Sequence, residues 1–291
     1  MPLSLENVSY VYMKGTPYER RAVDNVSLEI QKGEFVALIG HSGSGKSTLA
    51  QHMAGLLPPL AGQVKIDGTD PCAKGKEALT ARRKAGLVFQ YPEHQLFAET
   101  VFDDVAFGPR NLGLAEEEVR ERAATALDFA QMPIEEFGAR SPFQLSGGQM
   151  RKAAIAGVIA MRPDYLILDE PTAGFDPLAR GLFYEELKNL HKKSGMAVIM
   201  ITHSMEEAIE LARRLLVMSG GRIIIDGQPE RIFREQRGEL LAAGVTAPAI
   251  VSLTDRLRAH GFSINADCLD ADDLVAELLA VLPGKGPGDA R

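Results

Sequence analysis

A glycine-rich segment near residue 40 has the residue types needed to bind phosphate. It reads Gly40-His41-Ser42-Gly43-Ser44-Gly45-Lys46-Ser47 and fits the pattern G-x-x-x-x-G-K-[ST]. The glycines let backbone N–H groups turn toward an anion, and Lys46 adds a positive charge at the β- and γ-phosphates. The Ser47 hydroxyl can ligate Mg²⁺. The segment, together with Thr48, predicts a binding site for ATP and Mg²⁺, although a plain glycine-rich turn would look similar.

Two adjacent carboxylates follow an apolar run, Tyr165-Leu166-Ile167-Leu168-Asp169-Glu170. A buried parallel strand would deliver Asp169 to its carboxyl end, where ligands bind in such sheets. We expect Asp169 to hold Mg²⁺ through a water molecule. Glu170 points elsewhere and could polarise the water that attacks the γ-phosphate. Solvated acids at a strand end are the alternative, but a phosphate loop in the same chain favours the catalytic interpretation.

The pentapeptide Leu145-Ser146-Gly147-Gly148-Gln149 predicts a turn that opens a long helix, Gln149–Met161. Ser146 and the exposed N–H groups would form a second anion site. One nucleotide rarely needs two such sites in one chain. A head-to-tail dimer resolves this, because each copy would offer its Ser-Gly-Gly turn to the ATP of the other. Taken alone, the pentapeptide favours a simple N-cap followed by a turn.

These residues need a sheet that brings strand ends together. The apolar strand Phe35–Ile39 runs into the glycine-rich turn and then into a helix, Ser47–Leu57. The buried strands Tyr165–Leu168 and Met196–Ile201 enclose a helix at Pro177–Lys193, which favours an α/β fold with a parallel sheet. Shorter strands with a period of two, and one hairpin, are expected at Leu3–Tyr10, Val26–Ile30, Val64–Asp67, Leu215–Met218 and Arg222–Ile225.

The middle and the end of the chain are expected to be helical. Residues 91–161 contain an amphipathic helix, Ala115–Gln131, with one apolar face formed by Val119, Ala123, Leu127 and Ala130. We expect one domain over residues 1–237 and a small accessory domain over residues 238–291. The latter would contain helices at Pro248–His260 and Ala271–Leu282 and a frayed, Gly- and Pro-rich end at Pro283–Arg291.

Composition excludes several functions. The net charge is −7 and no basic face is evident, so nucleic-acid binding is not expected. The longest apolar runs, such as Met196–Ile201, are far shorter than the roughly 18–20 residues that span a bilayer. Cys72 and Cys268 form no metal or redox motif. With no apolar signal peptide at the start, a reducing cytoplasmic setting is expected.

The order of phosphate loop, LSGGQ and LILDE resembles the nucleotide-binding subunit of ABC transporters over about Leu3–Gln236. The resemblance implies a P-loop NTPase with a RecA-like core, an antiparallel β-subdomain and an α-helical subdomain. It implies that Gln90 reaches Mg²⁺ and the attacking water, that Asp176 belongs to the D-loop, and that His203 contacts the γ-phosphate. The family usually has Leu where Phe175 stands. Tyr12 falls where the family stacks an aromatic ring on adenine, with Tyr10, Tyr18 and a long insertion, Met13–Arg21, nearby.

A narrower resemblance rests on the sequence around Gln90. Phe89–Phe97, Thr100-Val101, Phe107-Gly108-Pro109 and Gln149–Lys152, together with the extra C-terminal segment, are similar to the ATPases of energy-coupling factor (ECF) importers. ECF importers pair two similar ATPases, and the segment Pro92-Glu93-His94 resembles the second of them. It implies a paralogous ATPase partner, or a second copy in isolation, a transmembrane coupling subunit and a small substrate-binding membrane protein. It also implies a peripheral position at the cytoplasmic membrane face, and vitamins or transition-metal ions as substrates.

Other classes of ABC protein fit less well. An ordinary ABC importer or exporter cassette is the alternative within transport. DNA-associated ABC ATPases place a very long coiled coil between the two motifs, whereas here about a hundred residues separate them without a heptad run. Ribosome-associated relatives carry two cassettes, and this chain has one. A scaffold without turnover would not need Lys46, Glu170 and His203. The C-terminal domain is expected to stabilise the ATPase dimer.

Overall fold

The computed structural model describes residues 1–265 and 271–281, and the expected frayed end and Cys268 lie outside them. Within these residues a six-stranded sheet has the order β5-β6-β7-β3-β8-β9. All neighbouring strands are parallel except β8 and β9. The strands are β3 Phe35–Ile39, β5 Ala85–Val88, β6 Tyr165–Asp169, β7 Ala197–Ile201, β8 Arg214–Ser219 and β9 Arg222–Gly227. The predicted parallel α/β sheet is confirmed.

Every residue of β3, β6 and β7 is buried. This explains why their sequences are continuously apolar and do not alternate, because helices or a second sheet cover both faces. The carboxyl ends of these neighbouring strands lead directly to the glycine-rich loop, to Glu170 and to Thr202. The topology therefore gathers the predicted chemistry at one edge of the sheet.

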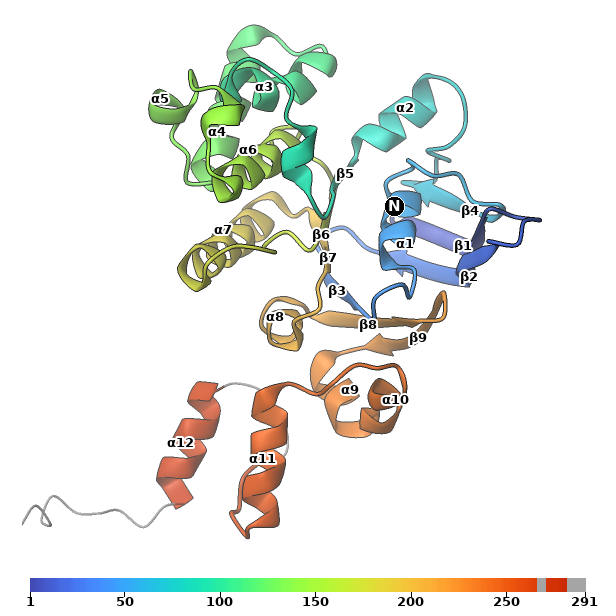
Figure 1. Ribbon diagram of the computed structural model, residues 1–291, viewed down its shortest axis with the longest axis vertical. Helices are drawn as coiled ribbons and strands as arrows, with labels where there is room; N and C mark the ends of the chain where they lie inside the picture. Colours follow the sequence, from blue (N-terminus) through green and yellow to red (C-terminus); the bar gives the residue numbers. More distant parts are fainter. Residues whose placement is uncertain (266–270, 282–291) are drawn as a thin grey trace, which may run out of the picture.

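A three-stranded antiparallel sheet of order β2-β1-β4 packs beside the main sheet. It consists of β1 Leu3–Tyr12, β2 Arg20–Ile30 and β4 Ala61–Ile66. Alternate residues of β1 such as Leu3 and Leu5 are buried against α1, Lys46–Met53, in a shared apolar cluster. Both long strands extend further than expected, so the insertion after Tyr12 shrinks to the turn at residues 13–19. Figure 1 shows this sheet on the side of α1.

Residues 91–161 contain only helical elements, which Figure 1 shows as a block at the β5 side of the main sheet. The predicted apolar face of α4 is buried at all four positions. The helices are η1 Pro92–Gln95, α3 Val101–Asn111, α4 Glu116–Phe129, α5 Ile134–Phe137, η2 Pro142–Gln144 and α6 Gly147–Ile159. A further helix that the sequence analysis did not predict, α2 Lys76–Arg83, precedes β5.

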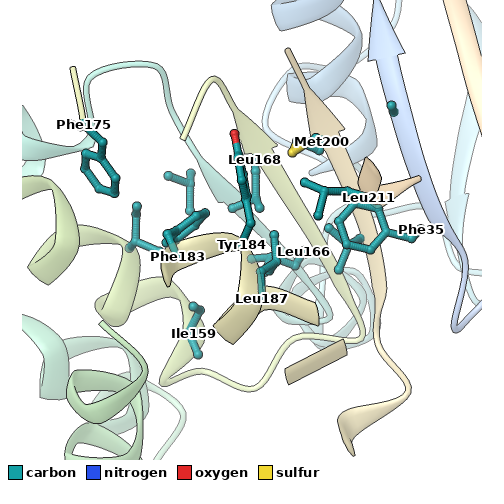
Figure 2. Close-up of a cluster of buried hydrophobic side chains, with 14 of the residues drawn as sticks. Phe35, Ile159, Leu166, Leu168, Phe175, Phe183, Tyr184, Leu187, Met200 and Leu211 are labelled. Carbon is teal, nitrogen blue, oxygen red and sulfur yellow. The ribbon is translucent and has the colours of Figure 1, made fainter. Parts of the chain in front are cut away.

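The face of the main sheet opposite α1 is covered by α7, Pro177–Ser194, and α8, Met205–Leu211. Figure 2 shows part of this cluster, in which Leu166 and Leu168 of β6 pack near Phe183, Tyr184 and Leu187 of α7. Asp176 caps α7 by accepting a hydrogen bond from the Ala179 N–H at 2.9 Å. The cap fixes where the helix begins, and with it the loop that follows Glu170.

The chain ends in α9 Pro229–Glu235, α10 Arg237–Ala242, α11 Ala249–Ala259 and α12 Ala271–Val281. Leu240 and Val245 are buried in the same cluster as the main sheet, whereas Ile264 and Leu274 form a separate cluster with residues of α11. The expected division after residue 237 stays a proposal, and this packing favours a boundary near residues 246–249. Among the described residues, no helix is long and apolar enough to cross a membrane.

Candidate ATP-hydrolysis site

The glycine-rich segment forms a tight loop between β3 and α1. Gly40 and Gly45 have φ angles of 151° and 110°, which favour glycine. A Cβ atom at Gly40 would lie 2.1 Å from the Met218 carbonyl oxygen, and one at Gly45 would lie 2.1 Å from the Ala22 carbonyl oxygen. These glycines allow the backbone to approach its neighbours closely and keep a cradle open for an anion.

Lys46 folds over this cradle. Its ammonium group donates hydrogen bonds to the carbonyl oxygens of Gly40 at 2.8 Å and His41 at 3.0 Å. Burial lowers the pKa of Lys46, while the Glu170 and Asp169 carboxylates act in the opposite direction. The cation is therefore held at the loop by weak carbonyl partners, which phosphate oxygens can replace with stronger, charge-assisted bonds.

Asp169 is nearly inaccessible and lies next to Ser47. Burial raises the pKa of Asp169, the hydrogen bond from the Ser47 hydroxyl opposes this shift, and the neighbouring Glu170 charge adds to it. A buried carboxylate beside a hydroxyl is an all-oxygen pair, the donor type that Mg²⁺ prefers. The residues present thus fit the expected ion.

The Glu170 carboxylate contacts two residues that follow neighbouring strands of the main sheet. Its Oε2 accepts a hydrogen bond from Gln90 Nε2 at 3.3 Å, and its Oε1 lies 2.6 Å from His203 Nε2. Gln90 follows β5, Glu170 follows β6 and His203 follows β7. The structure therefore brings together three residues that are far apart in the sequence, each of which the sequence analysis had selected.

These groups line a cavity of about 260 Å³. Tyr12 forms one wall, and its hydroxyl lies 3.3 Å from Thr48 Oγ1. Tyr10 packs edge-on against Tyr12, whereas Tyr18 is 78 % exposed and is not among the lining residues. The lining residues are Tyr12, Arg20, Ala22, Ser42, Gly43, Gly45, Lys46, Ser47, Thr48, Gln90, Glu170 and His203.

Arg20 is a lining residue that sequence reasoning missed. Its guanidinium donates to the Gly43 carbonyl oxygen at 3.1 Å, and a Cβ atom at Gly43 would collide with it at 2.4 Å. Arg20 stands at the start of β2, within the stretch expected to be an insertion. No local pattern could have identified it, because its partner is a backbone carbonyl of a distant loop.

The LSGGQ pentapeptide lies elsewhere, and none of its five residues lines the cavity. Ser146 accepts a hydrogen bond from the Gln149 N–H at 3.3 Å, and Gln149 accepts one from the Ser146 N–H at 3.0 Å. This capping box opens α6. Gly147 and Gly148 are exposed, with open space around them. Leu145 is buried and anchors the turn in the core.

The pentapeptide instead faces residues Ala173–Phe175 across a second cavity of about 390 Å³, which Gly147, Gly148 and Gly174 help to line. Arg151 of α6 also lines it, and the sequence analysis gave this residue no role. Its guanidinium contacts Glu93 Oε2 at 3.1 Å and donates to the Gln90 carbonyl oxygen at 2.8 Å. The helix that follows the pentapeptide is thereby fixed to the backbone of Gln90.

Fold and site together define a nucleotide-binding ATPase of the phosphate-loop class. The family model described as ABC transporter matches residues 23–173. The energy-coupling factor transporter ATP-binding protein EcfA2 of Clostridium tetani is 48 % identical over 98 % of this chain and 99 % of its own length. The protein of the same name from Symbiobacterium thermophilum is 48 % identical over 99 % of both chains.

Two solved structures are also similar. The structure of cbiO1 from Clostridium perfringens, described as part of the ABC transporter complex cbiONQ, has a TM-score of 0.70 and 36 % identity, covering 82 % of this chain and 94 % of that one. The ATP-binding cassette MJ0796, solved as a dimer bound to ADP and Pi, has a TM-score of 0.70 and 32 % identity, covering 78 % and 98 %.

This chain belongs to the energy-coupling factor transporter ATP-binding proteins, a group within the ABC transporter family. It is an ATPase subunit, which confirms both the broad resemblance drawn from the ATP motifs and the narrower one drawn from the sequence around Gln90. The relatives match from end to end, so the resemblance includes the C-terminal segment.

Proposed function

We propose that this chain closes head to tail with a second cassette around two Mg²⁺·ATP, and that hydrolysis reopens the pair. The observation that supports this proposal most strongly is that the phosphate loop and the Ser146 turn lie apart within one chain. The phosphate loop lines a cavity with Gln90, Glu170 and His203, whereas Ser146 and its glycines lie exposed outside it. The second cassette is a paralogue in the working complex and a second copy when the chain is isolated. Each site then needs residues from two chains.

Within one half-site, the chain's own residues bind and orient the nucleotide. Lys46 and the loop N–H groups, from Gly40 to Thr48, hold the phosphates, and the Tyr12 ring stacks on adenine. Ser47, Gln90 and Asp169 would hold Mg²⁺, with Asp169 acting through a water molecule. The bound ion supplies positive charge to the terminal phosphates. The buried position of Asp169 and the cradle beneath Lys46 support this assignment.

Glu170 is proposed to accept a proton from the attacking water. His203 lies 2.6 Å from Glu170 and contacts the γ-phosphate, so that it orients the carboxylate toward the reacting atoms. Asp176, exposed at the start of α7, belongs to the surface that meets the partner. Orientation and charge neutralisation supply most of the rate enhancement, because phosphoryl transfer requires little covalent chemistry from the protein.

An exposed aromatic patch near Gln90 supports a docking site for the transmembrane coupling subunit. Tyr91, Phe97 and Phe107 are 55 %, 61 % and 48 % exposed, and the rings of Phe97 and Phe107 pack edge to face at 4.9 Å. Exposed apolar patches mark interaction surfaces. We place the chain peripherally at the cytoplasmic membrane face. The coupling subunit would join it to a small substrate-binding membrane protein for a vitamin or a transition-metal ion.

The C-terminal helices are proposed to stabilise the pair of cassettes. Leu253 on α11, and Val275 and Leu279 on α12, are 47 %, 53 % and 70 % exposed. Within residues 1–265 and 271–281, their small cluster has Ile264 and Leu274 as its buried members, and these exposed side chains could contact a partner. Nucleic acid is not a proposed partner, because the chain carries a net charge of −7.

The Glu170→Gln variant tests the proposal. It keeps the size and most hydrogen bonds of Glu170 but removes the base. We expect steady-state ATP hydrolysis to fall by about 10²-fold or more, while ATP-dependent dimerisation, measured by size-exclusion chromatography, persists. Glu185→Gln, on the exposed face of α7, is the matched control and should turn over normally. Unchanged turnover in Glu170→Gln would contradict the role given to Glu170.

A further inference from the structure

A polar network behind the cavity joins the loops at the ends of β6 and β7. At its centre is the Glu207 carboxylate on α8, whose Oε2 accepts a hydrogen bond from the Thr202 hydroxyl at 2.6 Å. The same carboxylate acts on the Tyr184 hydroxyl of α7, because its negative charge helps to raise the pKa of that hydroxyl. Arg180 NH1 lies 3.7 Å from Glu207 Oε1. One carboxylate on α8 thus lies among groups from α7 and from the end of β7.

The loop after β6 and the loop after β7 each contribute one threonine to this network. Thr172, two residues after Glu170, places its hydroxyl 2.8 Å from the Tyr184 hydroxyl. Either hydroxyl can be the donor in this pair. On the other loop, the Thr202 hydroxyl accepts a hydrogen bond from the Ser204 N–H at 3.0 Å and so fixes the backbone on both sides of His203.

The tyrosine and the two threonines of the network are shielded from water, whereas the Glu207 side chain is partly exposed and that of Arg180 is exposed. Thr172, Tyr184 and Thr202 are 5 %, 3 % and 4 % exposed. Figure 2 shows the Tyr184 ring within the apolar cluster, with its hydroxyl oxygen pointing away from Leu187. Burial raises the pKa of Tyr184 well above its usual range, so the hydroxyl remains a donor at physiological pH. Buried networks with satisfied partners are rigid, because a lost hydrogen bond is not replaced by water.

We propose that Tyr184 and Glu207 are positioning residues that hold Glu170 and His203 in register. The proposal rests on the role assigned to Glu170 above. Neither positioning residue lines the cavity, so both act through the threonines at the two loops. Glu170 has a φ of 51°, a conformation that a glutamate keeps only when its surroundings enforce it. An anchored Thr172 two residues later supplies that constraint.

The Tyr184→Phe variant tests the proposal because it removes one hydroxyl and leaves the ring. We expect kcat for ATP hydrolysis to fall about 10- to 100-fold with KM for ATP unchanged, since the nucleotide contacts remain while the catalytic groups lose their register. Tyr165→Phe is the matched control. Tyr165 is also buried, and its hydroxyl bonds Asp67 Oδ1 at 3.1 Å at the opposite end of β6. This variant should lose stability but keep kcat.

A second measurement separates positioning from a general loss of structure. In single-turnover assays, Tyr184→Phe should reduce the residual rate of a Glu170→Gln chain little or not at all, because it acts through Glu170. Glu207→Gln should lower kcat in the same direction as Tyr184→Phe. Equal losses of kcat in Tyr184→Phe and Tyr165→Phe would overturn the proposal, as would the same fold-loss in the Glu170→Gln background.

The outcomes also distinguish this inference from the function on which it rests. If Glu170→Gln abolishes hydrolysis while Tyr184→Phe keeps the wild-type kcat, the base role of Glu170 stands and only the positioning role is overturned. If Glu170→Gln hydrolyses ATP at the wild-type rate, the proposed base itself is wrong.

Discussion

Glu170 adopts a left-handed backbone conformation directly after a buried strand. Such a conformation costs a non-glycine residue of the order of 1–3 kcal/mol and persists where neighbours hold it. Here the Glu170 N–H donates to the Ile201 carbonyl oxygen at 3.0 Å, and the carboxylate contacts Gln90 and His203. The turn directs the Glu170 side chain toward Gln90 and His203, which is consistent with the different roles proposed for the two adjacent carboxylates.

At the residue scale, Lys46→Met should remove nucleotide-dependent stabilisation. A ligand present at about 100 times its Kd stabilises a protein by about 2.7 kcal/mol, which corresponds to a rise in Tm of roughly 5–10 °C. We expect wild-type protein to show this rise with ATP in differential scanning fluorimetry and Lys46→Met to show little. Lys65→Met, at a distant surface ion pair with Glu6, should respond like wild type. A full ATP-dependent rise in Lys46→Met would show that Lys46 does not bind the phosphates.

At the scale of single elements, apolar runs and helix caps predicted the bounds of β3 and α7 well. The strand Phe35–Ile39 and the helix that begins at Pro177 have the bounds expected from their apolar runs and caps to within one residue. The short helices α2, α8, α9 and α10 were not predicted, because six to eight residues hold too little pattern. The reach of β1 and β2 beyond their apolar parts comes from mutual pairing, such as Tyr12 with Arg20.

Some residues of the candidate site could be predicted from the sequence, and others could not. Side chains within a motif, such as Lys46 and Glu170, could be selected from the sequence because spacing and residue type define their chemistry. Arg20 and Arg151 could not, since each binds a backbone carbonyl oxygen that only the folded chain brings near. The Tyr184–Glu207 network escaped for the same reason, because its members come from two helices and two loops.

Helix α1 carries a buried histidine whose charge state should affect stability. His52 is fully buried, its Nδ1–H donates to the Leu57 carbonyl oxygen at 2.7 Å, and Nε2 has no hydrogen-bond partner. Burial lowers the pKa of His52, and the hydrogen bond to Leu57 only partly opposes this. The folded-state pKa therefore lies below the unfolded value of about 6.5, so this group destabilises the fold as the pH falls below about 6.5.

We expect the free energy of unfolding to fall by up to about 1.4 kcal/mol per pH unit from His52 alone, as the pH drops from about 6.5 to 5. Denaturant unfolding of wild-type and His52→Gln proteins across this range measures the difference in slope. His260→Gln, at an exposed position, is the control and should retain the wild-type slope. Identical slopes for wild type and His52→Gln would show that His52 is not held neutral.

At the scale of the whole molecule, the two parts of the proposed reaction centre lie apart in one chain. No residue of the pentapeptide lines the cavity around Lys46 and Glu170. The second cavity, which the pentapeptide glycines line, has no lysine among its described lining residues. In the proposed head-to-tail pair, the phosphate loop of each chain would meet the Ser146 turn of the other. Arg151 links the two parts within one chain, since it bonds the Gln90 backbone from the helix that Ser146 caps.

Complementation between two inactive variants tests this account most directly. One chain carries Ser146→Arg, which blocks the exposed turn, and the other carries Lys46→Met together with Glu170→Gln, which disables its own phosphate site. Each chain alone should hydrolyse almost no ATP. Mixed at equal concentration, they should recover hydrolysis, because the phosphate loop of the first meets the intact turn of the second. Full activity of Ser146→Arg alone, or no recovery on mixing when the wild-type chain alone is active, would contradict the shared site.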